Sequence, residues 1–315
     1  MFLIKKSYAI STLALLLALA TGQSQTPVKV VLLGGQSNMD GWAYAQFLPT
    51  NLQNPQTDVL FFNGSQSAGN PSTLGSLRPN SVHGSDITFG PEITFGRAME
   101  DAHPADQYAL IKYSQGGTSL ATDWNPSTGA TYSAFKATVT SGLASLTNAG
   151  YAPQIIGMLW LQGENDSASL LQANAYEQNM RNFIIDIRSN YGNTLPFVIG
   201  GMGYANDPSY RDTVLTAQAN VAATMTNVRF FSDDDLNPNH VLHFGTAEMQ
   251  MIGQRFATNL NAIPEPNTWA MVLGGIGTLI GFQETAVVNS LNLIRLFHVP
   301  LSNAEGVRQR GQRGT

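Results

Sequence analysis

The sequence lacks cysteine and has few charged residues. Without cysteine, the 315-residue chain can form no disulfide, no thiolate metal site and no cysteine nucleophile. Charged residues make up 12% of the chain, about half the usual share, and the formal net charge is -5. The chain therefore has no basic excess with which to bind nucleic acid. Its length is enough for one large α/β domain or two small ones.

The N-terminal residues have the layout of a secretory signal peptide. Lys5 and Lys6 precede an apolar stretch from Tyr8 to Ala20, which ends in small residues that suit cleavage. This apolar core is shorter than a membrane span requires, so a membrane anchor is the less favoured alternative. We therefore expect residues 1–20 to be removed and the protein to be exported.

A second targeting pattern lies near the C-terminus. The tripeptide Pro264-Glu265-Pro266 precedes an apolar run from Met271 to Phe282. This arrangement resembles the PEP-CTERM sorting signal of Gram-negative bacteria, which implies that residues 262–283 associate transiently with a membrane during sorting. The resemblance further implies the periplasm, the outer surface or the extracellular matrix as the destination. The arginine cluster expected after Phe282 is missing, and a loop with a core helix is the alternative. Residues 284–315 form a polar tail of unknown role that we expect to be poorly ordered.

Between these ends, short apolar runs alternate with stretches of helical periodicity. Apolar runs predict strands at residues 28–33, 58–62, 108–112, 155–161, 197–199 and 228–231. Apolar residues at helical spacing predict helices at residues 92–103, 135–146, 176–187, 210–225 and 249–260. This alternation implies parallel strands joined by right-handed crossovers, so we expect one α/β domain over residues 27–261, a three-layer α/β/α sandwich with a central parallel sheet. Residues 63–90 predict a long loop of the kind that often forms a binding surface.

A serine directly follows the first predicted strand. Val28 to Leu33 read as a buried strand, and two glycines after it allow a sharp turn before Ser37. Open α/β sheets bind ligands at the carboxyl ends of their strands, so Ser37 is a candidate nucleophile. The alternative is a solvated serine in a polar turn. The stretch does not match the Gly-x-Ser-x-Gly elbow, because Met39 replaces the final glycine.

Several further stretches accompany this serine in a recognisable order. The first block runs from Gly35 to Gly41, and the blocks behind it are Gly90-Pro91-Glu92, Lys112 to Trp124, Trp160 to Asp166, and His243 to Ala257. Together they resemble the SGNH hydrolase superfamily, in the form of the sialate O-acetylesterase and acetylxylan esterase families. The resemblance implies an exported carboxylic ester hydrolase that removes acetyl groups from oligo- or polysaccharides through an acetyl-enzyme, with no cofactor or metal. The alternatives are a catalytically impaired carbohydrate-binding protein and a lipase or thioesterase of the same fold.

His243 is the best candidate for the general base. A serine hydroxyl needs an imidazole to take its proton at neutral pH, and the other histidines lie outside the family blocks. In the family an aspartate usually stands three positions before the catalytic histidine, but this chain has His240 there. An aspartate of the same loop, Asp233, Asp234 or Asp235, could orient the imidazole instead, and Asp235 is the nearest in sequence. A serine–histidine dyad is the alternative, and a metal pair of His240 with His243 is disfavoured.

The same resemblance suggests donors for the oxyanion hole. They are the backbone amides of Ser37 and Gly117 and one side-chain amide, for which we prefer Gln162 and take Asn165 as the second choice. Trp124 follows Gly117 in the same block, so it is a tentative carbohydrate contact, although tryptophans are more often core residues. Glu164 and Asp166 are expected to be structural carboxylates, with a role in positioning His243 as the alternative.

Overall fold

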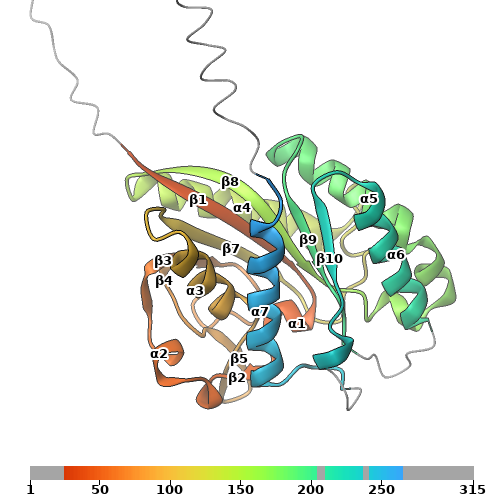
Figure 1. Cartoon of the computed structure of the whole chain (residues 1–315), viewed down its shortest axis with the longest axis horizontal. Helices are drawn as coiled ribbons and strands as arrows, with labels where there is room; N and C mark the ends of the chain where they lie inside the picture. The colour runs from red at the N-terminus through yellow and green to blue at the C-terminus, as the bar shows by residue number, and fades with distance from the viewer. Residues whose placement is uncertain (1–24, 204–209, 237–240, 265–315) are drawn as a thin grey trace, which may run out of the picture. The chain divides into compact units, whose positions relative to one another are not determined.

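The computed structural model describes residues 25–203, 210–236 and 241–264 (Figure 1). The predicted signal peptide, the sorting segment from Glu265 onward, the tail at residues 284–315 and His240 lie outside the described residues. The chain divides into two units, residues 1–264 and 265–315, and the fold below is that of the first.

A seven-stranded sheet forms the centre of the described fold, in the order β10-β9-β8-β1-β7-β3-β4. Its strands are β1 (Thr26–Gly35), β3 (Gln56–Asn63), β4 (Leu74–Leu77), β7 (Tyr108–Ser114), β8 (Tyr151–Leu161), β9 (Phe197–Gly200) and β10 (Val228–Phe231). Every pairing is parallel except that of the edge strand β4, which runs antiparallel to β3. The predicted α/β fold is confirmed, with one antiparallel edge added.

Helices cover both faces of this sheet. One hydrophobic core holds Val30 and Leu32 of β1, and the other holds Val31 and Leu33, because successive side chains of a strand point to opposite faces. The first core is closed by α4 (Ala130–Asn148), α5 (Leu170–Tyr191) and α6 (Arg211–Thr224), and the second by α3 (Glu92–Ala102) and α7 (Thr246–Asn261). This double burial explains why β1 is apolar without alternation.

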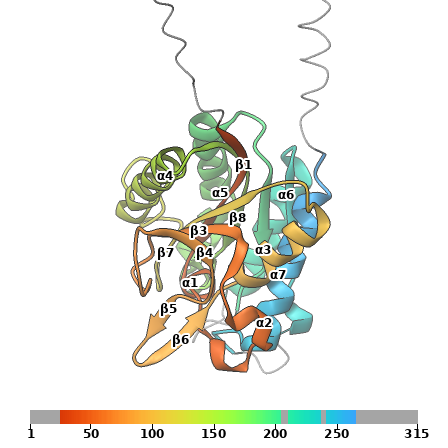
Figure 2. The ribbon, with the colours of Figure 1, turned by 90° about the vertical axis from the view of Figure 1, so that its left-hand side faces the viewer.

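A second, smaller sheet projects from the main one (Figure 2). It is antiparallel, in the order β2-β6-β5, and its strands are β2 (Ala43–Tyr44), β5 (Ser81–His83) and β6 (Asp86–Phe89). The prediction of one long loop over residues 63–90 is therefore wrong, since β4, β5 and β6 lie in that stretch. These strands are only three or four residues long, which is too short for alternation to stand out from a polar sequence.

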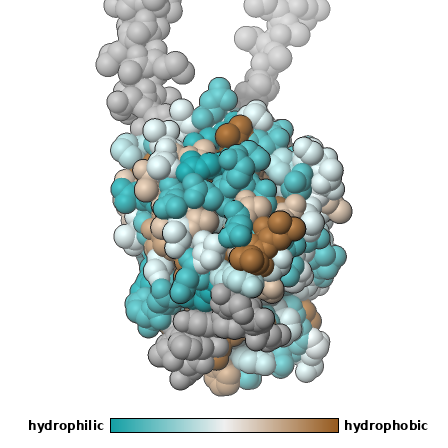
Figure 3. Space-filling view, turned by 90° about the vertical axis from the view of Figure 1, so that its right-hand side faces the viewer, coloured by the Kyte–Doolittle hydropathy of each residue, from teal (hydrophilic) through white to brown (hydrophobic). Residues whose placement is uncertain are grey.

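The remaining described elements are short. They are α1 (Ser37–Asp40), η1 (Ala45–Phe47), α2 (Thr50–Gln53), η2 (Asp166–Ala168) and η3 (Asp234–Leu236). On the side that carries α5 and α6, hydrophilic residues predominate and hydrophobic ones form small patches (Figure 3). Among the residues that the structure describes, no helix has both the length and the hydropathy needed to cross a bilayer.

Candidate active site

Strand register brings three sequence-distant loops to one edge of the sheet. Gly35, the last residue of β1, pairs with Ser114 of β7 and with Leu161 of β8. The segments that follow these three strands therefore start at the same level, at the carboxyl ends where α/β sheets bind ligands. Gly35 is required there, because an added Cβ would lie 2.1 Å from the carbonyl oxygen of Leu161.

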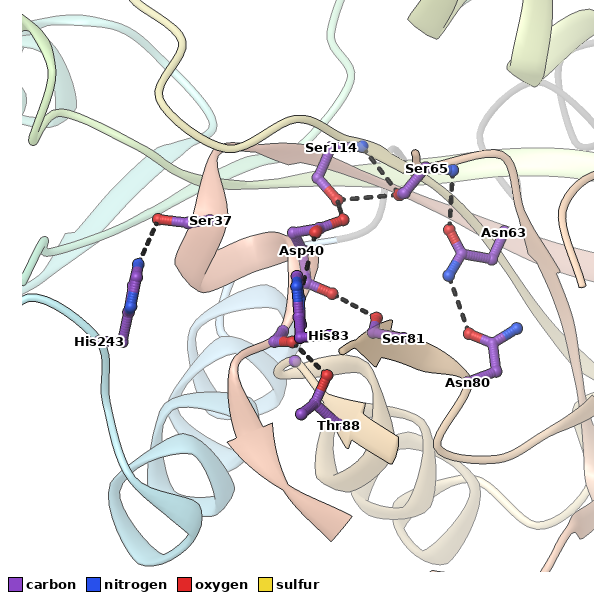
Figure 4. Close-up of polar contacts among 12 residues, drawn as sticks. Ser37, Asp40, Asn63, Ser65, Asn80, Ser81, His83, Thr88, Ser114 and His243 are labelled. Atoms are coloured by element: carbon purple, nitrogen blue, oxygen red, sulfur yellow. Dashed lines mark hydrogen bonds and ion pairs between the residues drawn. The ribbon is translucent and has the colours of Figure 1, made fainter. Parts of the chain in front are cut away.

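Ser37 and His243 meet at this edge. The Ser37 hydroxyl is 3.0 Å from Nε2 of His243, although 206 positions separate them in sequence (Figure 4). Burial, and to a lesser extent the nearby His83, lowers the pKa of His243 below its ordinary value. A neutral imidazole within hydrogen-bond distance of a serine hydroxyl can take its proton, so the pair has the geometry of a nucleophile and its base.

Asn38 fixes the backbone on both sides of His243. Its amide nitrogen donates to the carbonyl of Leu242 at 3.0 Å, and its amide oxygen accepts the N–H of Phe244 at 3.2 Å. The same nitrogen donates to Oε1 of Glu164 at 2.7 Å. The residue next to Ser37 therefore sets the position of His243. The sequence predicted no role for Asn38, although its place directly after Ser37 in the first block was the available signal.

Glu164 holds the Asn38 side chain in place. Its Oε1 also accepts the backbone N–H of Gly203 at 3.1 Å, and its side chain is buried. Burial raises the pKa of Glu164. The carboxylate thus acts on His243 only through Asn38. Asp166 is structural, as expected, because it accepts the N–H groups of Leu120 and Ala121 at 2.8 and 3.1 Å.

Backbone amides next to Ser37 are available to bind an oxyanion. Gly116 lies beside the nucleophile, since a Cβ added there would be 3.6 Å from Cβ of Ser37. Gly117 is exposed and adopts a positive φ of 69°, a conformation that favours glycine. Within the described part of the chain, the N–H groups of Ser37 and Gly117 donate to no protein acceptor. Both are therefore free to face a substrate oxygen.

Comparison with known families agrees with this geometry. Residues 27–262 match the model of the family described as carbohydrate esterase, sialic acid-specific acetylesterase. The chain belongs to this carbohydrate esterase family. The predicted resemblance to SGNH carbohydrate esterases is confirmed to that extent, and the protein is a carboxylic ester hydrolase. No curated protein matches the esterase in sequence.

Solved structures share the fold of the esterase at low sequence identity. A protein from Arabidopsis thaliana is 21% identical with a TM-score of 0.61, and the match covers 76% of this chain and 100% of that one. NanS is 15% identical with a TM-score of 0.55, covering 75% and 97% of the two chains. A carbohydrate acetylesterase from Xanthomonas citri is 17% identical with a TM-score of 0.52, covering 74% and 56%.

Gln162, the side chain we preferred as an oxyanion donor, is already occupied by other partners. In the esterase the Gln162 amide nitrogen already donates to the carbonyl of Thr118 at 3.0 Å and to Asp166 at 2.6 Å, and its side chain is fully buried. Gln162 therefore has no N–H left for a substrate. Asn165, the second choice, is partly exposed and donates one N–H to the carbonyl of Gly117 at 2.8 Å. Within the described residues its second N–H forms no hydrogen bond and remains available to a ligand.

Asp235 does not orient His243 in this structure. Its two carboxylate oxygens accept hydrogen bonds from Arg255 at 2.8 and 2.5 Å, and its side chain is 65% exposed. The neighbouring Asp234 is held by Arg211 at 2.6 Å. Across residues 25–203, 210–236 and 241–264, no carboxylate is hydrogen-bonded to His243. The described site of the esterase is thus a serine–histidine pair.

An aromatic stack takes up the space around the base. The Trp42 ring lies 4.4 Å from the His243 ring, with 12° between their planes, and 4.0 Å from the His83 ring. Nε2 of His83 is in turn 3.6 Å from the buried carboxylate of Asp40 (Figure 4). The Trp42 side chain is 40% exposed. Stacking restricts the tilt of the imidazole, which in other sites depends on a carboxylate.

Trp124 is a core residue, so its tentative role as a carbohydrate contact is wrong. Its side chain is fully buried, it packs edge-on against Trp160 at 4.9 Å, and its indole N–H donates to the hydroxyl of Thr118 at 3.0 Å. An apolar residue in a family block can therefore serve the core beneath the site.

A buried ion pair supports the short helix that carries Ser37. Nζ of Lys112 is 2.9 Å from Oε2 of Glu92, and both side chains are fully buried. The same nitrogen donates to the carbonyl of Asp40 at 2.9 Å, at the end of α1. Glu92 lies in the first turn of α3, and its side chain is paired with this lysine. Removing one partner would leave an uncompensated buried charge.

Proposed function

We propose that this carbohydrate esterase is an exported serine esterase that removes acetyl groups from oligo- or polysaccharides through a covalent acetyl-enzyme. The observation that carries the proposal is the 3.0 Å contact between Ser37 Oγ and His243 Nε2 at the carboxyl end of β1. Membership of the carbohydrate esterase family supports an acetylated carbohydrate as the substrate.

The first half of the reaction forms the acetyl-enzyme. Ser37 Oγ attacks the carbonyl carbon of the acetyl ester while its proton passes to Nε2 of His243. The resulting oxyanion accepts hydrogen bonds from the amides of Ser37 and Gly117 and from the second N–H of Asn165. When the tetrahedral intermediate collapses, the bond to the sugar oxygen breaks and His243 returns its proton to that oxygen.

Hydrolysis of the acetyl-enzyme repeats these steps with water. His243 Nε2 takes a proton from a water molecule, whose oxygen attacks the acetyl carbon. Collapse of the second intermediate breaks the bond to Ser37, which recovers its proton from His243, and acetate leaves. The lowered pKa of His243 keeps the imidazole neutral at the start of each half-reaction.

Export forms part of the proposal on sequence grounds. Lys5, Lys6 and the apolar stretch behind them support a signal peptide, and Pro264-Glu265-Pro266 supports sorting to the periplasm, the outer surface or the extracellular matrix of a Gram-negative bacterium. A polysaccharide in those locations would be accessible to the esterase.

Hydrolysis of a chromogenic acetate ester tests the proposal. The wild-type protein should release the chromophore, and Ser37→Ala should abolish that release while the exposed-serine variant Ser141→Ala, on α4, should not. Wild-type turnover by Ser37→Ala would refute the proposed nucleophile. A steep loss of activity with longer acyl chains would separate an acetylesterase from a lipase or thioesterase.

One specific observation favours a second candidate function. Because no described carboxylate contacts His243, the protein is also a candidate for a catalytically impaired carbohydrate-binding protein. Glycan binding by folded protein without turnover of any acetate ester would establish that function in place of the esterase.

A further inference from the structure

Two cavities adjoin along the small sheet beside the catalytic pair. One has a volume of about 240 Å³, and its lining includes Trp42, Tyr44, His83 and Asp86. The other has a volume of about 650 Å³ and continues past Tyr44 and Asp86, which line both. Trp42, whose ring stacks on His243, lines the smaller cavity, so this cavity begins one ring away from the base. The larger cavity continues from it along β2 and β6.

The Tyr44 ring in this lining is exposed, and a second exposed ring, that of Phe47, lies beside it. Tyr44 is 47% exposed, and its ring meets that of Phe47 edge-on at 6.3 Å, with Phe47 67% exposed. An aromatic pair left in water on the surface of a soluble domain indicates a binding surface. Rings of this kind present a flat apolar face, which suits the C–H faces of pyranose rings, while the Tyr44 hydroxyl remains available for hydrogen bonds.

The small sheet is held in a fixed position relative to the base. The hydroxyl of Thr246, the first residue of α7, donates to the carbonyl of Tyr44 at 2.9 Å. The hydroxyl of Thr88 on β6 donates to the carbonyl of Gly41 at 2.7 Å, just after α1. A ligand bound along β2 therefore lies at a defined distance from both Ser37 and His243, as a substrate subsite requires.

The polar lining of the larger cavity is mainly uncharged. Amide side chains come from Gln46, Gln53, Asn70 and Asn80. Amides offer both donors and acceptors, which match the hydroxyl groups of a neutral sugar.

Charge in the lining argues against an acidic sugar. Among the described residues that line the two cavities, Arg78 and Asp86 are the only side chains of Lys, Arg, Asp or Glu, so their formal charges cancel. Recognition of a carboxylate-bearing sugar commonly uses bidentate arginine with a net positive lining. The smaller cavity, which is nearer the base, contains no arginine or lysine.

We infer that these cavities form a chain-binding groove that holds the neighbouring units of an uncharged glycan while its acetyl group is at Ser37. This inference deepens the proposed function and rests on it. It commits the substrate class to acetylated neutral oligo- or polysaccharides, in preference to acetylated monosaccharides and to acetylated sialic acid.

The test compares substrates of increasing length on the full chain. Acetylated xylo- and manno-oligosaccharides, from the monosaccharide upward, would be assayed beside O-acetylated sialic acid and a chromogenic acetate. For the wild-type protein, kcat/KM should rise with chain length in at least one neutral series, mainly through a lower KM. An equal kcat/KM for monosaccharide and oligosaccharide, or a preference for O-acetylated sialic acid, would overturn the inference.

Substitutions at Tyr44 test whether the longer substrates bind along these cavities. Tyr44→Ala should lower kcat/KM on the longer neutral substrates by about tenfold, the usual cost of losing an aromatic contact, with chromogenic acetate hydrolysis unchanged. Tyr44→Phe should retain most of the effect of the ring. Ile185→Ala, at an exposed apolar residue on α5, should change neither activity.

The outcomes distinguish failure of the groove inference from failure of the proposed esterase function. If Ser37-dependent hydrolysis of the chromogenic acetate persists but Tyr44→Ala leaves the oligosaccharide kinetics unchanged, the groove inference fails and the esterase proposal stands. If the wild-type protein hydrolyses no acetate ester, the proposed function fails, and the groove inference fails with it.

Discussion

The imidazoles of His243 and His83 share an aromatic neighbour but have different polar partners. Both imidazoles stack on Trp42, but His243 faces the Ser37 hydroxyl at 3.0 Å, whereas His83 faces the Asp40 carboxylate at 3.6 Å. Among the described residues, His243 contacts the hydroxyl of the proposed nucleophile and no carboxylate, whereas His83 contacts a carboxylate and not that hydroxyl. Position at the carboxyl end of β1, rather than the presence of an acid, therefore distinguishes the proposed base.

The largest effect on activity is expected from removing either of the two proposed reacting side chains. Ser37→Ala and His243→Ala should each lower kcat by roughly 10⁶-fold, because the nucleophile and base act as a unit. Steady-state hydrolysis of a chromogenic acetate measures the loss. His103→Ala is the matched histidine control, since the His103 ring lies at an exposed site, 3.1 Å from the side-chain oxygen of Asn261. A loss in His103→Ala as large as that in His243→Ala would argue against His243 as the base.

Asn165→Ala tests whether this side chain donates to the oxyanion. We expect kcat to fall roughly 10²–10³-fold, the usual cost of one oxyanion donor, with little change in the thermal unfolding midpoint. Gln162→Ala should instead destabilise the fold, because it leaves buried partners of the amide without a hydrogen bond. Comparing kcat with unfolding temperature for the two variants distinguishes the roles. Full activity in Asn165→Ala would remove Asn165 from the oxyanion hole.

Trp42 joins the two regions, and its removal should misplace the base. Trp42→Ala is expected to lower kcat by up to about 10²-fold, since a small error in the position of a catalytic group is costly, whereas Trp42→Phe should retain part of the activity through a smaller stacked ring. The assay is kcat for the chromogenic acetate, with circular dichroism to verify folding. Equal activity in wild type and Trp42→Ala would show that stacking does not orient His243.

His83→Gln should produce a smaller effect, visible in the pH profile. Burial, followed by the nearby His83, lowers the pKa of His243, so kcat/KM should decline as the pH falls through a value below about 6.5. Removing His83 takes away its electrostatic effect on His243, which should raise the pKa of His243 and move the acid limb to higher pH. An acid limb that moves to lower pH, or not at all, would contradict this electrostatic coupling.

Asp233→Asn should change stability more than activity. Burial, and then the negative Glu164, raises the pKa of Asp233 to about 8. Because the folded-state pKa is above the unfolded value of about 4, wild-type stability should fall as pH rises between these values. The slope contributed by this group is at most about 1.4 kcal/mol per pH unit. Urea unfolding at several pH values should show the variant gaining on wild type as pH increases; a constant difference would argue against a buried, protonated Asp233.

Sequence alone was sufficient to predict that Ser37 and His243 meet at one edge of the sheet. The apolar run before Ser37 marks a buried central strand, and the later blocks follow β7 and β8, whose register with β1 brings them to one edge. The main helices and strands were also predictable, because their periodicity extends over several residues. The small sheet was not, since its strands are short and their pairing depends on tertiary contacts.

The errors within the site share one physical cause. Asp235, Gln162 and Trp124 each have suitable chemistry and a suitable place in the sequence. In the fold, Asp235 accepts hydrogen bonds from Arg255, and the Gln162 amide donates to Asp166. Trp124 packs within the aromatic core. Sequence spacing identifies which side chains come near the site, but competition among partners decides which remain free to act on a substrate.

Mass spectrometry of the protein quenched during turnover of an acetate ester tests the central claim most directly. The account predicts one added acetyl group on the peptide that contains Ser37, present in the wild-type protein and absent from Ser37→Ala. An acetyl group on a different residue, with the Ser37 peptide unmodified and turnover intact, would contradict it.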